Sequence, residues 1–377
     1  MTLIFRAQKR IKMSLISSIR NRYLSWSHST PLPDLPGTAP PVFQHWHAFN
    51  KTTSNWEIVQ PDLSKTSTPI PQEPNLRLLT WNIDAFGEKH ESRIEAILSK
   101  IRQMQVLTDT DENTNKNNRG LDIIFLQEVS KKALSHLLKD TWVQETWISS
   151  EADETNWAGG VPFATTTLLS RSRFQPPISN PHHHPSSSPG TTPDSAWGFS
   201  LGPVWRVRFP SRFQRDALCC DILWDRTTRI RLVNVHLDSL PIEPSLRPRQ
   251  VSIAADLLRA AGDGAGAGAG GRGVIAGDWN PVTEGDADLV GANGLVDAWE
   301  QLRPGEDGFT WGLDGKGEPF PPGRLDKVAV LGLRVTDIEV VHPGTLQQAT
   351  DAEGDTGVPW SDHSGLICSF THVGTAN

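Results

Sequence analysis

The sequence predicts an α/β domain. Short apolar runs that favour strands recur along the chain, and between them lie a few segments whose apolar residues repeat at helical spacing. A chain of 377 residues, 37% of them hydrophobic, can bury one large core or two ordinary domains. Because strands and a few helices are mixed along the chain, we expect one α/β domain rather than two.

The first part of the chain differs in composition from the rest. Basic residues lie among serines and apolar residues in the first thirty positions, and the first acidic residue is Asp34. This composition fits a mitochondrial transit peptide, and equally a disordered basic arm that helps nuclear entry or DNA contact. We predict an arm and a linker over residues 1–41, the α/β domain over residues 42–377, and a nuclear or mitochondrial, intracellular location.

Strand and helix patterns alternate from residue 76 onwards. A strand over 76–80 precedes a helix, because Ile94, Ile97, Leu98 and Ile101 fall at helical spacing. After a strand over 121–126, Ser130 can cap a short helix. The stretch 175–195, full of proline, serine and histidine, predicts a mobile surface insertion. The later predicted elements are strands over 218–224 and 230–237, a helix ending at Gly262, and strands at 274–276, 325–330 and 366–370.

Composition excludes several classes of protein. The net charge of −7 argues against a generic nucleic-acid coat, but not against an enzyme that grips a phosphodiester through a metal ion and a local basic strip. Three cysteines, two of them adjacent, cannot build a disulfide framework, which favours a reducing compartment. Because no stretch of about 20 apolar residues occurs, we expect no membrane span.

Polar side chains follow the ends of six predicted segments. In V-I-A-G-D-W-N, Asp278 and Asn280 stand two apart after a buried strand, so both face one spot. The other positions are Asn82, Asp84, Gln127, Glu128, His236, Asp238, Ser239, Asp326, Ser361, Asp362 and His363. Carboxylates that converge would raise one another's pKa unless a cation lies among them. Oxygen ligands without cysteine suit Mg²⁺ or Mn²⁺ rather than zinc.

These motifs, in order, resemble the endonuclease/exonuclease/phosphatase superfamily: T-W-N, L-Q-E-V, H-L-D-S, G-D-W-N, R-L-D-K-V and S-D-H-S-G. The resemblance runs from about Leu76 to Phe370. Within the superfamily the chain is most similar to the tyrosyl-DNA phosphodiesterase 2 branch, through T-W-N-I-D, H-L-D-S, V-D-A-W-E with T-W, and S-D-H-S-G-L. It differs in Trp279, where a smaller residue is more common, and in the insertion 175–195.

The resemblance implies a four-layer α/β/β/α sandwich, with two mixed, mainly antiparallel sheets flanked by helices and the motif loops gathered on one edge. It also implies a metal site, with Glu128 as direct ligand and Asn82, Asp84 and Asp362 completing or orienting the water shell. Asp278 would deprotonate the attacking water, and Asn280 would hold water or a phosphate oxygen. The expected donors to the phosphate are His236, Ser239 and His363, with Asp326 bound to the far nitrogen of His363.

A local basic strip is the second functional signal. Its arginines are Arg206, Arg208, Arg212 and Arg215, with Arg226, Arg229 and Arg231 close behind. On alternating strand positions they would line a groove for a DNA strand, although a solvated arginine face is the alternative. By resemblance, Arg215 lies near the phosphotyrosine ring, and Arg247 with Gln250 forms a supporting pair behind the site. We predict Arg212, Arg215, Arg247 and Trp311 as substrate or DNA-binding residues, and Trp279 as a second possible stacking platform.

The function that the resemblance implies is hydrolysis of 5′-phosphotyrosyl links between DNA and trapped topoisomerase II in DNA repair, leaving a 5′-phosphate. The expected partners are DNA 5′ ends that bear a peptide or tyrosyl adduct, and we expect a monomer. Alternatives with the same chemistry are a general or abasic-site endonuclease and a small-molecule phosphatase. A catalytically inactive scaffold is the alternative from another class, and the complete set of acids and histidines argues against it.

Overall fold

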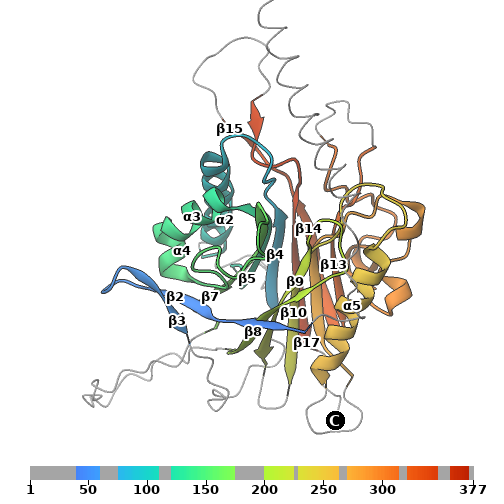
Figure 1. Cartoon of the computed structure of the whole chain (residues 1–377), viewed down its shortest axis with the longest axis horizontal. Helices are drawn as coiled ribbons and strands as arrows, with labels where there is room; N and C mark the ends of the chain where they lie inside the picture. The colour runs from blue at the N-terminus through green and yellow to red at the C-terminus, as the bar shows by residue number, and fades with distance from the viewer. Residues whose placement is uncertain are drawn as a thin grey trace, which may run out of the picture.

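Two β-sheets packed face to face form the centre of the molecule, and helices lie outside them (Figure 1). The computed structural model describes residues 40–59, 75–109, 120–174, 199–224, 228–262, 270–313, 321–346 and 357–372. Residues 1–39 of the predicted arm and the whole predicted insertion 175–195 lie outside the described residues. The domain boundary at residue 42 therefore stays a prediction.

The first sheet has seven strands in the order β1-β8-β9-β10-β11-β13-β12. Their bounds are β1 Val42–Gln44, β8 Ser200–Arg208, β9 Asp216–Leu223, β10 Arg229–His236, β11 Gly273–Asp278, β12 Val296–Asp297 and β13 Asp326–Leu331. Strands β10 and β11 are parallel, and the other neighbours in this sheet are antiparallel. The carboxyl ends of β10 and β11 therefore meet at one edge.

The second sheet has eight strands in the order β14-β17-β4-β5-β7-β6-β2-β3. Their bounds are β2 Trp46–Asn50, β3 Asn55–Val59, β4 Leu76–Asn82, β5 Ile123–Ser130, β6 Trp147–Ser149, β7 Phe163–Ser170, β14 Leu333–Val341 and β17 Gly365–His372. Here β4 and β5 form the parallel pair. A separate small ladder joins β15 Thr345–Leu346 to β16 Val358–Pro359.

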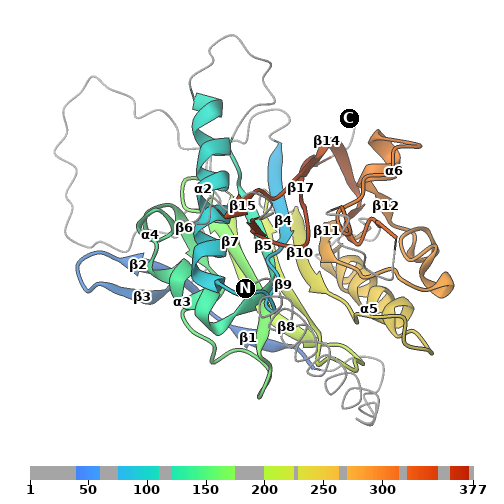
Figure 2. The same ribbon diagram turned by 90° about the horizontal axis from the view of Figure 1, so that it is seen from above.

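Helices cover the outer faces of both sheets, as the view from above shows (Figure 2). On the eight-stranded sheet lie α2 His90–Asp109, α3 Lys131–Lys139 and α4 Thr141–Thr146, and on the seven-stranded sheet lies α5 Arg247–Arg259. The remaining helical segments are α6 Ala298–Leu302, η1 Ala260–Gly262, η2 Glu284–Asp286 and η3 Gly291–Asn293. The predicted cap is confirmed, because the Ser130 hydroxyl accepts a hydrogen bond from the backbone N–H of Ala133.

Three hydrophobic cores separate the four layers. In β5, Phe125 packs between the two sheets, while its neighbours Ile124 and Leu126 pack under α2 and α3. A third core lies between the seven-stranded sheet and α5, where Leu258 meets Ile275. Side chains alternate between the faces of a strand, and in β5 both faces are buried, which explains the apolar run I-I-F-L at residues 123–126. The predicted α/β/β/α sandwich is confirmed.

The cysteines lie in the interior of the fold. The three cysteines, Cys219, Cys220 and Cys368, are free and buried. Burial raises the pKa of each thiol well above its ordinary value, so they are inert packing residues. Among the described residues, none of the helices has the length and apolar character needed to cross a membrane.

Candidate active site

The predicted polar residues meet at one edge of the sandwich, where strands of both sheets end. Strand β4 ends at Asn82 beside the β5 segment that carries Glu128, and β10 ends at His236 beside the end of β11. Residues His236, Asp278 and Asp326 are register partners across β10, β11 and β13. His363 enters the same edge from the loop before β17. Both sheets therefore contribute to a single site.

Unusual backbone geometry aims several of these side chains. Asp84, Glu128 and Asn280 have positive φ angles of 53°, 56° and 46°, a conformation that costs about 1 kcal/mol or more outside glycine. The pairing of β5 shifts register around Glu128, which indicates a β-bulge that changes the direction of the Glu128 side chain. Gly277 has a φ of 143°, and a Cβ at this position would lie 1.9 Å from the Val235 carbonyl oxygen. Only glycine lets β11 approach β10 so closely before Asp278.

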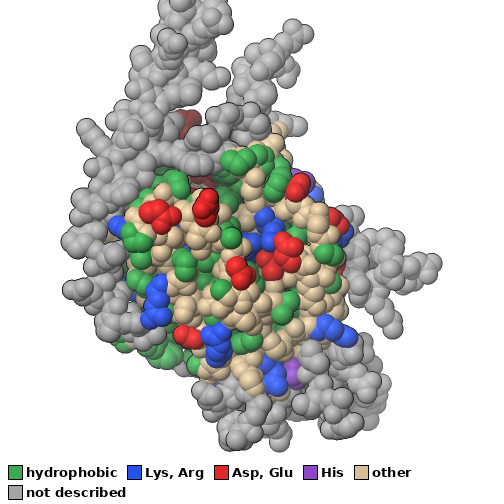
Figure 3. All heavy atoms as spheres, turned by 90° about the vertical axis from the view of Figure 1, so that its right-hand side faces the viewer, with side chains coloured by type: hydrophobic (Ala, Val, Ile, Leu, Met, Phe, Trp, Pro, Cys, Tyr) green, Lys and Arg blue, Asp and Glu red, His purple; other side chains and the backbone are tan. Residues whose placement is uncertain are grey.

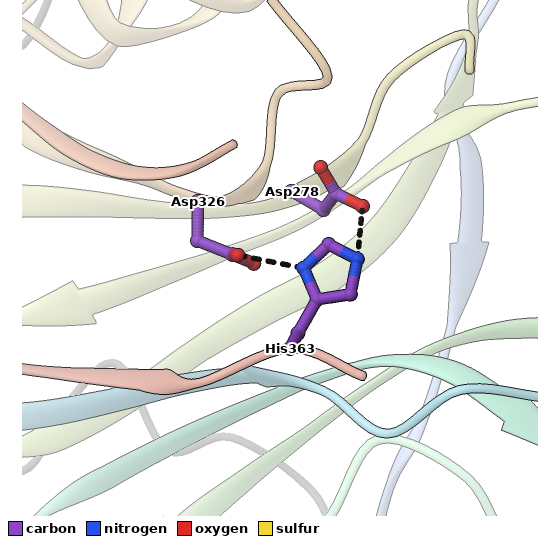
Figure 4. Close-up of side chains that lie close together, drawn as sticks. All are labelled: Asp278, Asp326 and His363. Carbon is purple, nitrogen blue, oxygen red and sulfur yellow. Dashed lines mark hydrogen bonds and ion pairs between the residues drawn. The ribbon is translucent and has the colours of Figure 1, made fainter. Parts of the chain in front are cut away.

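His363 lies between two carboxylates (Figure 4). Its Nδ1 is 2.8 Å from Oδ2 of Asp326, and its Nε2 is 3.8 Å from Oδ2 of Asp278. Burial alone would lower the pKa of His363, but the charges of Asp326, Asp278 and Asp362 raise it well above the ordinary value. The imidazole is therefore a cation that can donate a hydrogen bond from Nε2.

Asp278 is held by two hydrogen bonds and almost fully buried. The Asn82 amide donates to its Oδ2 at 2.9 Å, and the backbone N–H of Asn280 donates to its Oδ1 at 3.0 Å. Burial raises the pKa of Asp278 to about 6, with Asp326 adding to the rise and His363 opposing it. A carboxylate with this pKa can accept a proton near neutral pH.

A second group of carboxylates surrounds Glu128. Burial and the nearby charges of Asp84 and Asp362 raise the pKa of Glu128 to about 7, although Arg215 opposes the rise. Burial and the charge of Asp362 also raise the pKa of Asp84, while Arg93 opposes that rise. The Glu128 carboxylate accepts a hydrogen bond from the backbone N–H of Ala85 at 2.8 Å. Three mutually repelling acids fit a hard divalent cation, which would relieve the repulsion.

Asp278, Asp326 and His363 also lie close enough to share a metal ion, since their ligand atoms fall within 4.8 Å of one another. The neighbouring carboxylates raise the pKa of His363, and a protonated imidazole has to lose its proton before it can bind a metal, which disfavours this assignment. The group around Glu128 is therefore the better candidate for a metal ion.

His236 faces both carboxylate groups. Its Nε2 is 3.5 Å from Oδ2 of Asp278 and 3.7 Å from Oε1 of Glu128, and neither ring nitrogen has a hydrogen-bond partner among the described residues. Burial, with the charges of Arg215 and His363, lowers the pKa of His236 well below its ordinary value. The imidazole is neutral, so one nitrogen can donate to a ligand held between the two groups.

A pocket beside His236 contains Arg215. The Arg215 guanidinium lies over the rings of Phe163 and Phe213, at 4.9 Å and 5.6 Å from their centroids, and Nη2 donates to the Ser239 hydroxyl at 3.2 Å. The pocket is lined by Ala158, Val161, Pro162, Phe163, Ala164, Thr165, Phe213, Gln214, Arg215, Asp216 and His236. The sequence interpretation missed Phe163, because an aromatic residue in a strand is ordinarily a core residue.

The other predicted substrate residues lie at different depths. Half-buried Trp311 donates from Nε1 to Oδ2 of Asp362 at 3.3 Å, and half-buried Arg212 donates its backbone N–H to Asp238. The prediction that Arg247 contacts substrate or DNA is wrong, because the residue is 1% exposed and cannot contact a bound strand. It donates to the Asp238 carbonyl at 2.8 Å and binds Asp286, so it supports the H-L-D-S loop from behind.

Two arginines of the predicted strip do not line a groove. Arg206 is buried and pairs with Glu151 at 2.6 Å, and Arg231 is buried against Asp221 at 2.7 Å. Arg208 and Arg229 are exposed, and Arg226 lies outside the described residues. On the face shown in Figure 3, basic side chains are scattered among acidic ones. The groove hypothesis is therefore wrong for Arg206 and Arg231.

Trp279 also departs from the prediction. Its side chain is fully buried in the core under α5, so it cannot stack on a base from the surface. Neighbours along an extended segment point to opposite sides, so the residue between Asp278 and Asn280 faces away from the site.

Comparisons with known proteins agree with this architecture. The model of the Endonuclease/Exonuclease/phosphatase family matches residues 79–363. No curated protein matches the sequence. The structure of D. rerio TDP2 complexed with single-strand DNA product is similar, with 18% identity, 78% of this chain and 98% of that chain covered, and a TM-score of 0.53. The structure of TDP2 from Caenorhabditis elegans is similar with 18% identity and a TM-score of 0.54, and the match covers 79% of this chain and 74% of that chain. An endonuclease/exonuclease/phosphatase family protein from Bacteroides thetaiotaomicron is similar with 14% identity and a TM-score of 0.51, and the match covers 80% of this chain and 99% of that chain.

Proposed function

The chain belongs to the Endonuclease/Exonuclease/phosphatase family, and from this premise we propose that it is a divalent-metal-dependent phosphodiesterase acting on 5′-phosphotyrosyl links between DNA and trapped topoisomerase II. The reaction leaves a 5′-phosphate on the DNA and serves DNA repair. Members of the family are hydrolases. The observation that carries the proposal is the Arg215 pocket, which places a cation and aromatic rings beside His236, whose Nε2 is 3.5 Å from Oδ2 of the candidate base Asp278.

The group around Glu128 would hold the metal ion, Mg²⁺ or Mn²⁺. Glu128 is the proposed direct ligand, and Asp84 and Asp362 complete the negative charge around it. A divalent ion supplies Lewis-acid stabilisation of a phosphoryl oxygen when it is bound. Asn82 links this group to the base, because its side-chain Nδ2 donates to Asp278 while its side-chain Oδ1 accepts the backbone N–H of Asp84 at 3.0 Å.

Asp278 is the proposed general base. It takes a proton from water, the water oxygen bonds to phosphorus, and the bond from phosphorus to the tyrosyl oxygen breaks. The leaving phenolate has an ordinary pKa of about 10, so it departs more readily than a deoxyribose alkoxide. Cationic His363 donates to a non-bridging oxygen, and neutral His236 does so from the other side. Each well-aimed donor contributes about 3 kcal/mol to transition-state stabilisation.

Arg215 is the proposed contact to the tyrosyl ring. Its guanidinium already lies against two aromatic faces, so a third ring can pack against the same cation. Ser239, which accepts its hydrogen bond, and Asn280 are placed to bind phosphate oxygens. The partner in this proposal is a DNA 5′ end that carries a peptide or tyrosyl adduct. The similarity to the TDP2 structure complexed with single-strand DNA product supports single-stranded DNA as the polymer. Arg212 and Trp311 are the proposed further contacts to it.

The test is a substrate panel with Mg²⁺, with Mn²⁺ and with excess chelator. It compares a 5′-tyrosyl oligonucleotide, an abasic duplex, a plain duplex and an inositol phosphate, and uses Asp278→Asn as the inactive control. We expect fastest turnover on the tyrosyl oligonucleotide and none with chelator. Preference for the abasic duplex, the plain duplex or the inositol phosphate would assign one of the alternative activities. Absence of turnover on all four would favour the scaffold.

A further inference from the structure

Arg93 connects two of the loops that carry the acidic group around Glu128. It lies in the first turn of α2, and its side chain is 2% exposed. Its Nη2 donates to the carbonyl oxygens of Ile83 at 2.8 Å and Asp84 at 3.0 Å, in the loop after β4. Its Nε donates to the Trp360 carbonyl at 2.7 Å, two residues before Asp362. One guanidinium therefore spans both segments.

The guanidinium also forms an ion pair inside this loop. Its Nη2 is 2.9 Å from Oδ2 of Asp84, whose Oδ1 accepts the backbone N–H groups of Phe86 and Gly87 at 3.0 Å each. A Cβ on Gly87 would lie 1.8 Å from Nη1 of Arg93 and 2.6 Å from Oδ2 of Asp84. The φ of Gly87 is outside the left-handed region, so space and not backbone conformation requires glycine here. The missing side chain of Gly87 leaves the space that the ion pair between Arg93 and Asp84 occupies.

Other contacts hold the neighbouring part of the site. The Ser361 hydroxyl donates to the Asn82 carbonyl at 2.6 Å and accepts the backbone N–H of His363 at 3.0 Å, and the Trp81 indole donates to the His363 carbonyl at 3.0 Å. These contacts fix His363. Arg93 connects the loop that carries Asp84 to the segment that leads to Asp362, through its hydrogen bonds to the carbonyl oxygens of Asp84 and Trp360.

We propose that Arg93 is a positioning residue for the metal site, with Gly87 as the space that it requires. It fixes the separation of Asp84 and Asp362, the two carboxylates whose charges act on Glu128. This inference rests on the metal site of the proposed function, but not on the tyrosyl-DNA substrate.

Geometry and charge act in opposite directions at this position. A fixed cation beside the acidic group repels a metal ion, so its removal would tighten binding if charge dominated. If geometry dominates, its removal would loosen the two carboxylates and weaken binding. We expect geometry to dominate, because Arg93 reaches three carbonyl oxygens on two segments and a lysine ammonium cannot span them. Arg93→Lys keeps the positive charge but removes the guanidinium that reaches both segments, so it separates the effect of charge from the effect of geometry.

The experiment measures metal affinity of the full chain without substrate. Mg²⁺ titration calorimetry and Mn²⁺ electron paramagnetic resonance are applied to wild type, Arg93→Lys and Gly87→Ala, with circular dichroism to confirm folding. If geometry dominates, both Arg93→Lys and Gly87→Ala should bind either ion about 10–100-fold more weakly than wild type does. Arg102→Lys is the matched control, because Arg102 lies on the same helix and pairs with Glu95 and Asp140 away from the site. It should keep wild-type affinity.

A second measurement distinguishes positioning from general damage. At saturating metal the Arg93→Lys variant should recover most of its turnover on the preferred substrate, because the carboxylates are displaced but present. Wild-type affinity or tighter binding in Arg93→Lys and Gly87→Ala overturns the inference. A wild type that binds neither ion overturns it together with the metal site. A wild type that binds metal but ignores tyrosyl-DNA sinks the proposed substrate alone and leaves the role of Arg93 standing.

Discussion

Replacing Asp278 with asparagine separates the chemistry of this carboxylate from its place in the fold. Asparagine keeps the shape and, through Oδ1, the hydrogen bond from the backbone N–H of Asn280, but its Nδ2 cannot accept from the Asn82 amide and it cannot take a proton from water. Loss of a general base slows a reaction about 10²–10⁴-fold. DNA affinity should be kept or increased, because a carboxylate beside a phosphodiester repels it in the ground state.

The same substitution should stabilise the metal-free protein. The pKa of Asp278 rises from 3.8 in the unfolded chain to about 6 in the fold, so the folded state holds the proton more tightly. Stability therefore falls as pH rises from about 4 to about 6. At pH 7 the whole penalty is present, on the order of a few kcal/mol. Asparagine carries no charge and escapes it.

The assay pairs two measurements on one preparation. Single-turnover cleavage of a 5′-tyrosyl oligonucleotide and affinity for the uncleaved DNA are taken at fixed salt. Urea unfolding in chelator is then compared at pH 5 and pH 7, where the advantage of the variant should be larger at pH 7. A variant that binds poorly but cleaves normally when saturated would make Asp278 a binding residue. A variant less stable than wild type at pH 7 would refute the burial argument.

Three further substitutions test other parts of the site. Asp326→Asn should lower the pKa of His363, so the alkaline limb of the pH–rate profile should move to lower pH; an unmoved limb would deny that His363 acts as a cation. Glu128→Gln should weaken Mg²⁺ binding in calorimetry without loss of stability in urea at pH 7, and wild-type affinity would exclude Glu128 as a ligand. Gly277→Ala should cost more than about 1 kcal/mol in urea unfolding, whereas Gly159→Ala, with open space around its Cβ position, should stay within about 0.5 kcal/mol; equal effects would contradict the close approach of β10 and β11.

Local pattern predicted the parts of the fold that depend on local physics. The helical spacing around Ile94 and the apolar run that includes Phe125 correspond to α2 and β5, because both elements bury continuous surfaces. Strand β14, L-R-V-T-D-I-E-V-V, was missed although its alternation was legible. Strand β7, F-A-T-T-T-L-L-S, gave a weaker signal, because its threonines are as common in loops as in buried strands.

The meeting of the motif residues was predictable for a topological reason. Polar residues that follow buried strands collect at the carboxyl edge of a sheet, and Asp278 and His236 do so as register partners. The burial of Arg206 was not predictable, because it depends on Glu151, 55 residues away, and a lone arginine in a strand indicates solvent. Trp279 was predictable from alternation alone, since the two flanking polar residues already occupied the site-facing side.

The site draws Asn82 and Glu128 from one sheet and His236 and Asp278 from the other, so neither sheet alone contains a reaction centre. Activity during refolding therefore reports the docking of the two sheets, not the formation of either. Turnover cannot recover before the two sheets dock, so any delay of turnover behind helical circular dichroism measures the closing of the sandwich. Substitutions in the core between the sheets, such as at Phe125, would lengthen that delay while they leave every catalytic group chemically intact.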